Sequence, residues 1–466
     1  MTDREQLPGN FDIAADLDTP VSAYLKLQPL RPRYLLESVE GGTRLARYSF
    51  LGFGAATEVT IGRDSVRIGT DERPLPNDID GLKALLREAL ATTPALAPAI
   101  DDLPFDGGLV GYAAYDIVRY FERLAAPRPS EHGIVAAYAG CESVLVFDHL
   151  TRRMALLHAG SDVERRQLKQ RVIDLLRGPL PAQSSESNPT PPSASLDQAT
   201  FEDLVRRCQK YIRAGDIYQI VLSVRFAGAG RPPPFDVYRA LRLLNPSPYM
   251  FYLDIGGLQV AGSSPEALVR CSDRQASLRP IAGTRPRGET ADVDRQLEQE
   301  LLADPKECAE HVMLVDLARN DLGRVAEVGT VHVDPYMTIE RYSHVMHIVS
   351  GVSGTLATDA DAFDLFAAAF PAGTLVGAPK VRAMQIIDEL EPVNRELYAG
   401  TVGYFGKSGD MDQAITIRTL VFDGDNYSFQ AGAGIVADSD PTAEYHEVLH
   451  KSAILRSALA IAAEGL

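Results

Sequence analysis

The stretch TFEDLVRRCQKYIRAGDIYQIVLSVRF, residues Thr200–Phe226, contains the change of periodicity that decides the fold class. Its first four residues, Thr200–Asp203, resemble a capping box and Gly215 is typical of a helix end, so we predict a helix over 200–215. The residues Ile217–Phe226 then alternate in the manner of a strand. The elements predicted on either side follow one another without a regular β–α–β order. This pattern favours α+β layers over a doubly wound parallel sheet.

Outside Thr200–Phe226, hydrophobic periodicity predicts the other helices and strands, and one segment lacks such periodicity. Upstream strands are predicted at Glu58–Ile61, Ser65–Ile68, Ile134–Phe147 and Met154–Ala159, and upstream helices at Ile79–Leu90 and Asp162–Leu176. Downstream helices are predicted at Pro234–Leu244, after Pro305, after Pro379 and at the C-terminus, with strands reaching Ile281 and Val436. The segment GPLPAQSSESNPTPPSASLD, Gly178–Asp197, is crowded with Pro and Ser and is typical of a flexible surface connection. We therefore divide the chain into an N-terminal region (1–177), a linker (178–197) and a C-terminal region (198–466).

The composition excludes several classes of function. The net charge of −17, from 46 basic and 63 acidic residues, argues against a nucleic-acid partner. A local basic pocket remains compatible with an anionic substrate. No apolar run approaches the roughly 20 residues of a membrane span, and the polar N-terminal stretch is unlike a signal peptide. Four cysteines without a CxxC pair indicate reduced thiols, so we expect a cytoplasmic protein: Cys141, Cys208, Cys271 and Cys308.

Two predicted helices begin with Asp-Pro and carry glutamates three residues apart: DPKECAEH (Asp304–His311) and DPTAEYHE (Asp440–Glu447). Asp caps helices well, Pro is tolerated at the first helical position, and residues at i and i+3 share a face. If the two faces meet, four carboxylates form a hard-oxygen site suited to Mg²⁺ shared with an anionic substrate. A structural interpretation stays open, because acids in first turns also complete capping boxes and favour the helix dipole.

Two polar residues lie in predicted strands. Gln219 shares a strand face with Ser223 and Arg225, so it faces either a polar cavity or solvent. Arg418 lies in an otherwise apolar strand predicted over Asp412–Phe422. A buried charge needs a partner, and for Arg418 that partner is either a substrate carboxylate or a structural acid.

Eight segments of the C-terminal region form a joint pattern. They are GDIYQIVLS (Gly215–Ser223), SSPEALV (Ser263–Val269), PIAGTRPRG (Pro280–Gly288), EHVMLVDLARNDLGRV (Glu310–Val325), ERYSHVMHIVS (Glu340–Ser350), GAPKVRAM (Gly377–Met384), GTVGYF (Gly400–Phe405) and AGAGIV (Ala431–Val436). In this order they occur in the chorismate-utilising enzymes, which the chain resembles over about 200–463, and most closely in the anthranilate-forming branch. The N-terminal half resembles the family less densely. The resemblance implies a layered α/β sandwich of the aminodeoxychorismate-synthase-like type, with two half-units around a deep cleft.

The resemblance also implies a binding site for chorismate and a metal. In it Glu310 and Glu447 hold Mg²⁺, and Glu307 and Glu444 are outer or alternative ligands. The metal would bind the ring carboxylate of chorismate, while Arg418 and Lys451 pair with carboxylates. The substrate-binding residues it implies are Gly283, Thr284, Tyr404, Arg418, Ala431, Gly432, Ala433, Gly434 and Lys451.

Four catalytic residues follow from the same resemblance. Glu266 is implied as the general acid, which the reaction needs because hydroxide is a poor leaving group. His347 is implied in the eliminating half-reaction, although a structural histidine of a sheet would look the same in the sequence. Gln219 and Thr374 complete the set. Gln219 stands where isochorismate-forming relatives use a lysine to activate water, and Ala282 stands where aminodeoxychorismate synthases have a lysine nucleophile.

These residues imply a lyase that converts chorismate and ammonia to anthranilate and pyruvate, the first step of tryptophan biosynthesis. No cysteine stands in a glutaminase context, so the resemblance implies a separate glutamine amidotransferase subunit that supplies the ammonia. Three alternatives stay open. The chain could make 2-amino-2-deoxyisochorismate, it could be an aminodeoxychorismate synthase component I, or it could be an inactive tryptophan-sensing paralogue.

Two short segments resemble the paired tryptophan-binding segments of feedback-inhibited family members. They are LLES (Leu35–Ser38) and NPSPYM (Asn245–Met250). The resemblance implies that L-tryptophan contacts Glu37 and Ser38 and that its indole lies against Pro248, Tyr249 and Met250. The alternative is a core strand followed, far along the chain, by a plain turn.

Overall fold

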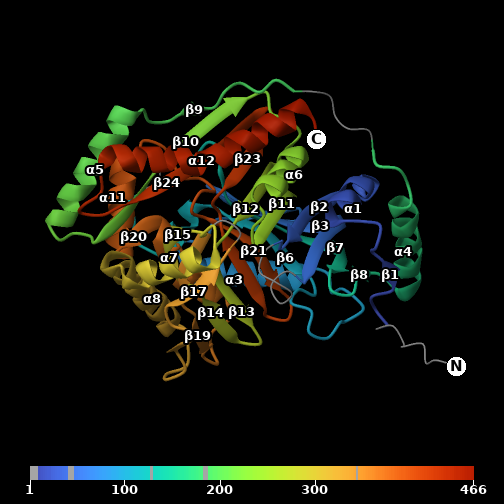
Figure 1. Cartoon of the computed structure of the whole chain (residues 1–466). Helices are drawn as coiled ribbons and strands as arrows, with labels where there is room; N and C mark the ends of the chain where they lie inside the picture. Colours follow the sequence, from blue (N-terminus) through green and yellow to red (C-terminus); the bar gives the residue numbers. More distant parts are fainter. Residues whose placement is uncertain (1–8, 40–46, 126–127, 129, 182–186, 343–344) are drawn as a thin grey trace.

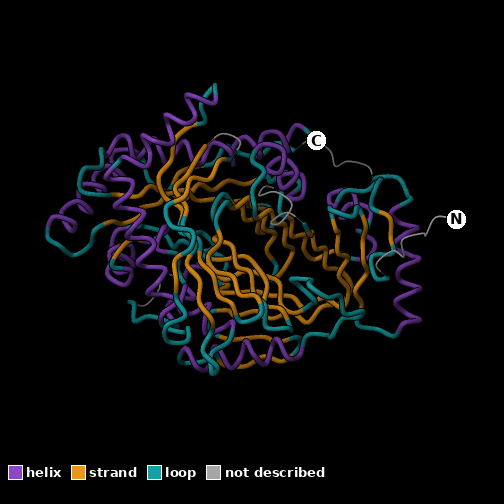
Figure 2. Tube along the Cα trace, turned by 60° about the horizontal axis from the view of Figure 1, so that its bottom comes forward, coloured by secondary structure: helices purple, strands orange, loops and turns teal. Residues whose placement is uncertain are grey.

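In the computed structural model, the described residues form one curled sheet of 21 strands and a separate sheet of three. The structure describes residues 9–39, 47–125, 128, 130–181, 187–342 and 345–466. Figure 2 shows the strands gathered in the middle of the molecule and most helices on its outside. This arrangement confirms the layered α+β fold.

The helices and strands follow one another irregularly along the chain (Figure 1). The helices are α1 (Pro20–Lys26), α3 (Ile79–Thr92), α4 (Asp162–Leu176), α5 (Gln198–Arg213), α6 (Pro234–Leu244), α7 (Ala291–Ala303), α8 (Pro305–Gly323), α9 (Ala362–Ala369), α10 (Gly373–Val376), α11 (Lys380–Leu390) and α12 (Pro441–Glu464). The strands of the large sheet are β1 (Ile13–Ala14), β2 (Pro32–Glu37), β3 (Tyr48–Gly62), β4 (Ser65–Ile68), β5 (Asp71–Pro74), β6 (Gly108–Ala113), β7 (Ile134–Asp148), β8 (Arg153–His158), β9 (Ser193–Ala194), β10 (Gln219–Ala229), β11 (Tyr249–Ile255), β12 (Leu258–Ser264), β13 (Ala267–Ser272), β14 (Gln275–Leu278), β16 (His332–Val333), β19 (Val352–Thr355), β20 (Gly377–Ala378), β21 (Thr401–Gly406), β22 (Met411–Ile415), β23 (Thr419–Asp423) and β24 (Asn426–Ile435). The small sheet contains β15 (Ile281–Pro286), β17 (Thr338–Arg341) and β18 (Val345–Val349).

Strands from both sides of the 178–197 connection pair with each other. β6 pairs with β21, and β2 pairs with β11, in both cases antiparallel. Part of the connection also joins the sheet, because β9 lies along β10. The division of the sequence at 178–197 therefore separates two regions that build one sheet.

Several predicted boundaries are wrong: the strand predicted at Glu58–Ile61 is part of the longer β3, and the strand predicted from Ile217 begins at Gln219. The helix predicted from Thr200 begins at Gln198, because Asp197 is its N-cap and accepts a hydrogen bond from the backbone of Thr200. The strand predicted over 412–422 is two strands, β22 and β23, separated by a break. Arg418, with a φ of 49°, lies in that break. The break exists because β22 pairs with β13 and β21, whereas β23 pairs with β12 and β24.

A buried ion pair fixes the end of α11 to the centre of the sheet. The Arg395 guanidinium lies 2.7 Å from the Glu391 carboxylate, and both side chains are almost fully buried. Glu391 accepts hydrogen bonds from the backbone and hydroxyl of Ser223, and Arg395 donates to the carbonyls of Val221 and Leu375. The pair thus joins β10 to α10.

Removal of one partner leaves the other charge buried and unpaired. We expect Glu391→Ala to lower the free energy of unfolding by about 3–5 kcal/mol, measured by urea denaturation. Glu389→Ala is the matched control, because Glu389 binds Arg207 at 3.0 Å with both side chains nearly half exposed. Its loss should cost less than about 1 kcal/mol. Equal effects of the two substitutions would contradict the structural role of the buried pair.

Candidate active site

The small sheet holds His347 at its centre. The strand order is β15–β18–β17, and His347 of β18 lies opposite Thr284 on one side and Glu340 on the other. Its Nδ1 lies 3.0 Å from the carbonyl oxygen of Gly283 and 3.1 Å from the hydroxyl of Thr284. Burial lowers the pKa of His347, which favours its neutral imidazole.

Glu266 lies between β12 and β13 and has the properties of an acid catalyst. The hydroxyl of Thr374 donates a 3.0 Å hydrogen bond to its Oε1. Burial raises the pKa of Glu266 to about 7, whereas the Thr374 bond and the charges of Arg418 and Lys451 act in the opposite direction. A large share of Glu266 is therefore protonated near neutral pH, as a proton donor requires.

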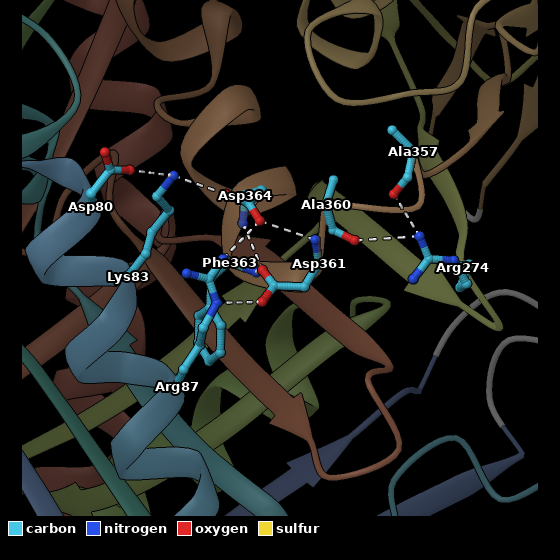
Figure 3. Close-up of polar contacts among 9 residues, drawn as sticks. All are labelled: Asp80, Lys83, Arg87, Arg274, Ala357, Ala360, Asp361, Phe363 and Asp364. Atoms are coloured by element: carbon cyan, nitrogen blue, oxygen red, sulfur yellow. Dashed lines mark hydrogen bonds and ion pairs between the residues drawn. The ribbon is translucent and has the colours of Figure 1, made fainter.

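Ion pairs connect α9, the helix that precedes Thr374, to the N-terminal region. Asp361 caps α9 by accepting hydrogen bonds from two backbone N–H groups of its first turn. From α3, Arg87 binds Asp361 at 2.6 Å and Asp364 at 2.8 Å, and Lys83 binds Asp364 at 2.9 Å (Figure 3). These contacts fix the start of α9, which α10 and its Thr374 follow directly.

Cationic groups and a glycine surround the same region. Arg418 lies close enough to both Glu266 and His347 to lower the pKa of each. Lys451 of α12 donates to the carbonyl oxygen of Gly432 at 3.2 Å and forms a 2.6 Å ion pair with Glu447. A Cβ at Gly432 would lie only 2.6 Å from the hydroxyl of Tyr398 and 2.7 Å from a backbone oxygen. Glycine is therefore needed where β24 passes beneath this tyrosine.

The pairing of β10 with β24 brings two predicted segments together. The four residues 431–434 lie opposite Val221–Val224 and continue β24 beyond the part that pairs with β23. Gln219 is buried, which rules out its solvent-facing alternative, and a Cβ at Gly434 would lie 3.0 Å from its Nε2. The same Nε2 donates a 3.3 Å hydrogen bond to Glu310 of α8. Gln219 therefore links the glycine-containing strand to the acidic helix.

The two Asp-Pro helices form as predicted. Asp304 accepts hydrogen bonds from two backbone N–H groups at the start of α8, and Asp440 accepts one at the start of α12. Asp440 and Asp304 thus direct the first turns of the two helices, which carry the four glutamates.

The four glutamates lie in one electrostatic cluster. Burial raises the pKa of Glu310, and the charges of Glu307 and Glu447 raise it further. Burial likewise raises the pKa of Glu444, with a further contribution from Glu447. Glu307 lies 3.3 Å from Arg285. Within the described ranges, no group of three or more His, Cys, Asp or Glu side chains has the geometry of a metal site. The donor chemistry fits a hard cation, although the side chains do not form a closed ligand set.

Tyr404 is not brought to this cluster. It lines a large cavity together with Asp412 and Tyr249, and the wall of this cavity also includes Pro265 and Ala267, the two neighbours of Glu266. The tyrosine that does lie beside Gly432 is Tyr398, six residues earlier, which sequence reasoning missed. Both tyrosines belong to the segment LYAGTVGYF, and no local signal tells them apart.

The cavity that contains Tyr404 has a volume of about 1020 Å³. Its wall includes Ser38 and the segment Pro248–Met250, which the sequence paired with each other. These segments do lie side by side, since Met250 is opposite Glu37 in the pairing of β2 with β11. The carboxylate of Glu37 is already engaged by the hydroxyl of Tyr238 and by Arg242.

A comparison with family models agrees with this site. A model described as chorismate binding enzyme matches residues 31–457. The fold and site thus define a chorismate-utilising protein, and the chain belongs to the chorismate-binding enzyme family.

Similar proteins narrow the assignment within the family. Anthranilate synthase component 1 of Thermus thermophilus is 46% identical, over 97% of this chain and 97% of that protein. Anthranilate synthase component 1 of Pseudomonas aeruginosa is 44% identical, over 99% of this chain and 97% of that protein. The crystal structure of anthranilate synthase component I from Streptococcus pneumoniae superposes with a TM-score of 0.79 at 33% identity, covering 98% of this chain and 100% of that one. The isochorismate synthase MenF of Escherichia coli, at 22% identity and a TM-score of 0.71 over 95% of this chain and 92% of that one, shares the fold.

The structure also bears on the expectations for the cysteines and for membrane spans. The four cysteines are free thiols, as their spacing indicated. Within the part of the chain that the structure describes, every helix is too short or too polar to cross a bilayer.

Proposed function

We propose that this chain converts chorismate and ammonia to anthranilate and pyruvate, as the component I subunit of an anthranilate synthase. One observation carries the proposal. Glu266 has a pKa near 7 and lies among Thr374, Arg418 and Lys451 in one site. A protonated carboxyl beside fixed positive charge suits a dianionic substrate whose hydroxyl must leave.

The acidic residues around Glu310 fit a Mg²⁺ ion. Burial and mutual repulsion raise the pKa of Glu310, so its ionised form is destabilised by its surroundings. A divalent cation would remove that destabilisation, and carboxylate oxygens are its preferred ligands. Glu310 and Glu447 would hold the ion, with Glu307 and Glu444 as outer ligands. When bound, Mg²⁺ would orient the ring carboxylate of chorismate and withdraw charge from the ring.

The first half-reaction uses Glu266. The lone pair of ammonia attacks ring C2, the two ring double bonds shift, and the bond from C4 to its hydroxyl breaks. Glu266 donates a proton to that hydroxyl, so that water leaves instead of hydroxide. Arg418 and Lys451 pair with the substrate carboxylates and fix the ring against this acid.

The second half-reaction uses His347. The neutral imidazole removes the proton from C2 of the aminated intermediate. The electrons of that C–H bond form the new ring double bond, and the bond from C3 to the enolpyruvyl oxygen breaks. The departing enolate takes up a proton and becomes pyruvate, while the aromatic ring is anthranilate.

Two residues support ammonia as the nucleophile. Gln219 cannot act as the lysine base that a water-using relative needs, whereas ammonia is a competent nucleophile without one. Ala282, buried in β15, cannot form the covalent intermediate of a lysine nucleophile. Both residues favour direct amination over the isochorismate and aminodeoxychorismate branches.

The chain's own cysteines do not suit glutamine hydrolysis. Burial raises the pKa of Cys141 and Cys208 to about 12 and that of Cys271 to about 11, which disfavours the thiolate. Cys308, in the first turns of α8, donates to the backbone carbonyl of Leu302 near the end of α7. We therefore assign ammonia delivery to a separate glutamine amidotransferase subunit.

The function is tested with the purified chain, chorismate, MgCl₂ and an ammonium salt at mildly alkaline pH. Anthranilate fluorescence that rises with time and disappears with EDTA is the expected result. Chorismate consumption without pyruvate release would assign the chain to the intermediate-forming branch. If chorismate is not consumed, with or without an amidotransferase partner, the proposal is wrong and a tryptophan-sensing protein is favoured.

The large cavity is the proposed site of feedback inhibition by L-tryptophan. It is spacious enough for an amino acid with an indole ring, and Pro248 and Met250 offer apolar walls beside the hydroxyl of Ser38. The cavity also reaches Pro265 and Ala267, the two neighbours of Glu266. Tryptophan would therefore act by favouring a conformation in which Glu266 is displaced.

Substitution of Ser38 tests this site. We expect Ser38→Phe to fill part of the cavity and weaken inhibition by L-tryptophan at least about tenfold, a loss of about 1.4 kcal/mol in binding. Ser65→Phe, on β4 and outside the cavity lining, should leave inhibition unchanged. The readout is the tryptophan concentration that halves anthranilate formation. If millimolar tryptophan does not slow anthranilate formation by the wild-type chain, the proposed feedback inhibition is wrong. The proposed catalytic function does not depend on that result.

A further inference from the structure

A row of three side chains crosses the small sheet at His347. Thr284, His347 and Glu340 are directly opposite one another on β15, β18 and β17. Directly opposite residues of antiparallel strands have their side chains on the same face. Glu340 is thus placed on the same face as the His347 ring, on the side away from Thr284.

The β15 side of the row fixes the tautomer of His347. Nδ1 lies 3.0 Å from the carbonyl oxygen of Gly283, and a carbonyl can only accept a hydrogen bond. Nδ1 therefore carries the proton, and Nε2 keeps its lone pair. The ring is prepared to take a proton at Nε2.

The β17 side of the row holds an acid in place. Arg279 forms an ion pair with Glu340, and the hydroxyl of Tyr342 donates to its other oxygen at 3.1 Å. The Tyr342 ring also meets the His347 ring edge to face, with centroids 5.6 Å apart. Tyr342 thus connects Glu340 to the imidazole, and both Glu340 and Tyr342 line the large cavity.

We propose that Glu340 is a positioning residue for the second half-reaction, because it holds Tyr342 against His347 and stabilises the imidazolium that forms there. This inference rests on the proposed function. When Nε2 takes the C2 proton, His347 becomes positively charged. The charged groups that face it among the described residues are Glu340, which favours that charge, and Arg418, which opposes it. The Gly283 carbonyl and the Thr284 hydroxyl on β15 are neutral.

Glu340 is not expected to take part in the amination step. Amination needs a proton from Glu266, and Glu340 is not part of its surroundings. Loss of the Glu340 charge should slow only proton removal from C2 and the pyruvate release coupled to it. The aminated intermediate then accumulates.

The test replaces Glu340 with glutamine, which keeps the shape of the side chain and removes its charge. We expect chorismate consumption to stay within about threefold of wild type and the rate of conversion of the intermediate to fall about tenfold, equivalent to a pKa change of about one. Chromatography separates the intermediate from anthranilate. The pKa of the His347 ring, followed by NMR and assigned by the signal lost in His347→Asn, should fall in Glu340→Gln.

Glu298→Gln is the matched control. Glu298 of α7 binds Arg341, which is the residue after Glu340. The Arg341 side chain therefore points to the face of β17 opposite to that of Glu340. Glu298→Gln should change neither the product ratio nor the pKa of His347. If Glu340→Gln proves poorly folded, Tyr342→Phe removes the hydrogen bond to Glu340 but keeps the ring, and the same changes are expected at smaller size.

The possible outcomes separate the two proposals. Equal product ratios in Glu340→Gln and Glu298→Gln, with an unchanged pKa of His347, would overturn the role of Glu340. A wild-type chain that forms no anthranilate would overturn the proposed function instead. In that case the pKa of His347 still reports whether Glu340 acts on the ring.

Discussion

Replacement of Glu310 by glutamine is expected to lower anthranilate formation about a thousandfold. Glu310 is a partly buried acid of the cluster, and burial and the charges of Glu307 and Glu447 raise its pKa, although a hydrogen bond from Gln219 and the charge of Lys306 act in the opposite direction. Loss of one anionic donor removes several kcal/mol of stabilisation from a bound divalent cation, and each 1.4 kcal/mol changes the rate about tenfold. The measurement is the initial rate of anthranilate fluorescence at saturating chorismate and ammonia.

The design includes a matched acid on the same helix. Asp316 of α8 is highly exposed, and among the residues that the structure describes it forms an ion pair with Arg319, so Asp316→Asn should retain wild-type activity. A titration of Mg²⁺ distinguishes a lost ligand from a lost fold, because Glu310→Gln should need far more Mg²⁺ while its unfolding midpoint stays near that of Asp316→Asn. Activity of Glu310→Gln above about a tenth of wild type would exclude Glu310 as a metal ligand.

The acidic cluster shows what local sequence predicts well. Asp304 and Asp440 each start a helix because an Asp-Pro pair satisfies free backbone N–H groups and fixes the first turn. The spacing of the glutamates then follows from helical geometry alone. That the two helices meet depends on contacts between distant parts of the chain, which spacing does not contain.

Arg418 shows where local pattern fails. Alternation of side chains predicts one strand over 412–422, because the apolar residues continue on both sides of the arginine. In the structure the chain changes pairing partners at this point, and Arg418 takes a left-handed conformation between β22 and β23. The break depends on pairing with β12 and β13, which are far away in the sequence.

The tyrosines give the same lesson for the site. The motif GTVGYF predicts a substrate contact at Tyr404, but pairing of β21 with β6 and β22 places Tyr404 at the large cavity. Tyr398 lies just ahead of β21 and reaches Gly432. The place of each tyrosine is decided by the neighbours of β21, and a contact of Tyr404 with the substrate stays a prediction. Two pairs of the predicted site residues are in contact, Glu266 with Thr374 and Gln219 with Glu310, while their catalytic roles stay predictions.

Replacement of Glu266 by glutamine is expected to lower kcat about 10³-fold, within the range of a lost general acid. Glutamine keeps the size of the side chain but has no proton to give to the C4 hydroxyl. Because the amination step is lost, neither the intermediate nor anthranilate should form, in contrast to the expected behaviour of Glu340→Gln. Normal accumulation of the intermediate in Glu266→Gln would contradict the assignment of Glu266 to the first half-reaction.

The pH dependence of kcat tests the same acid in the wild-type chain. Glu266 must be protonated to act, and burial raises its pKa to about 7, so kcat at a fixed concentration of free ammonia should fall as the pH rises through that value. The hydrogen bond from Thr374 stabilises the ionised form and so lowers the pKa. Thr374→Val removes this bond, raises the pKa, and should move the decline of kcat to higher pH. A decline that stays in place in Thr374→Val would mean that a group other than Glu266 is responsible for it, since no other titrating side chain loses a hydrogen bond in this variant among the contacts that the structure describes.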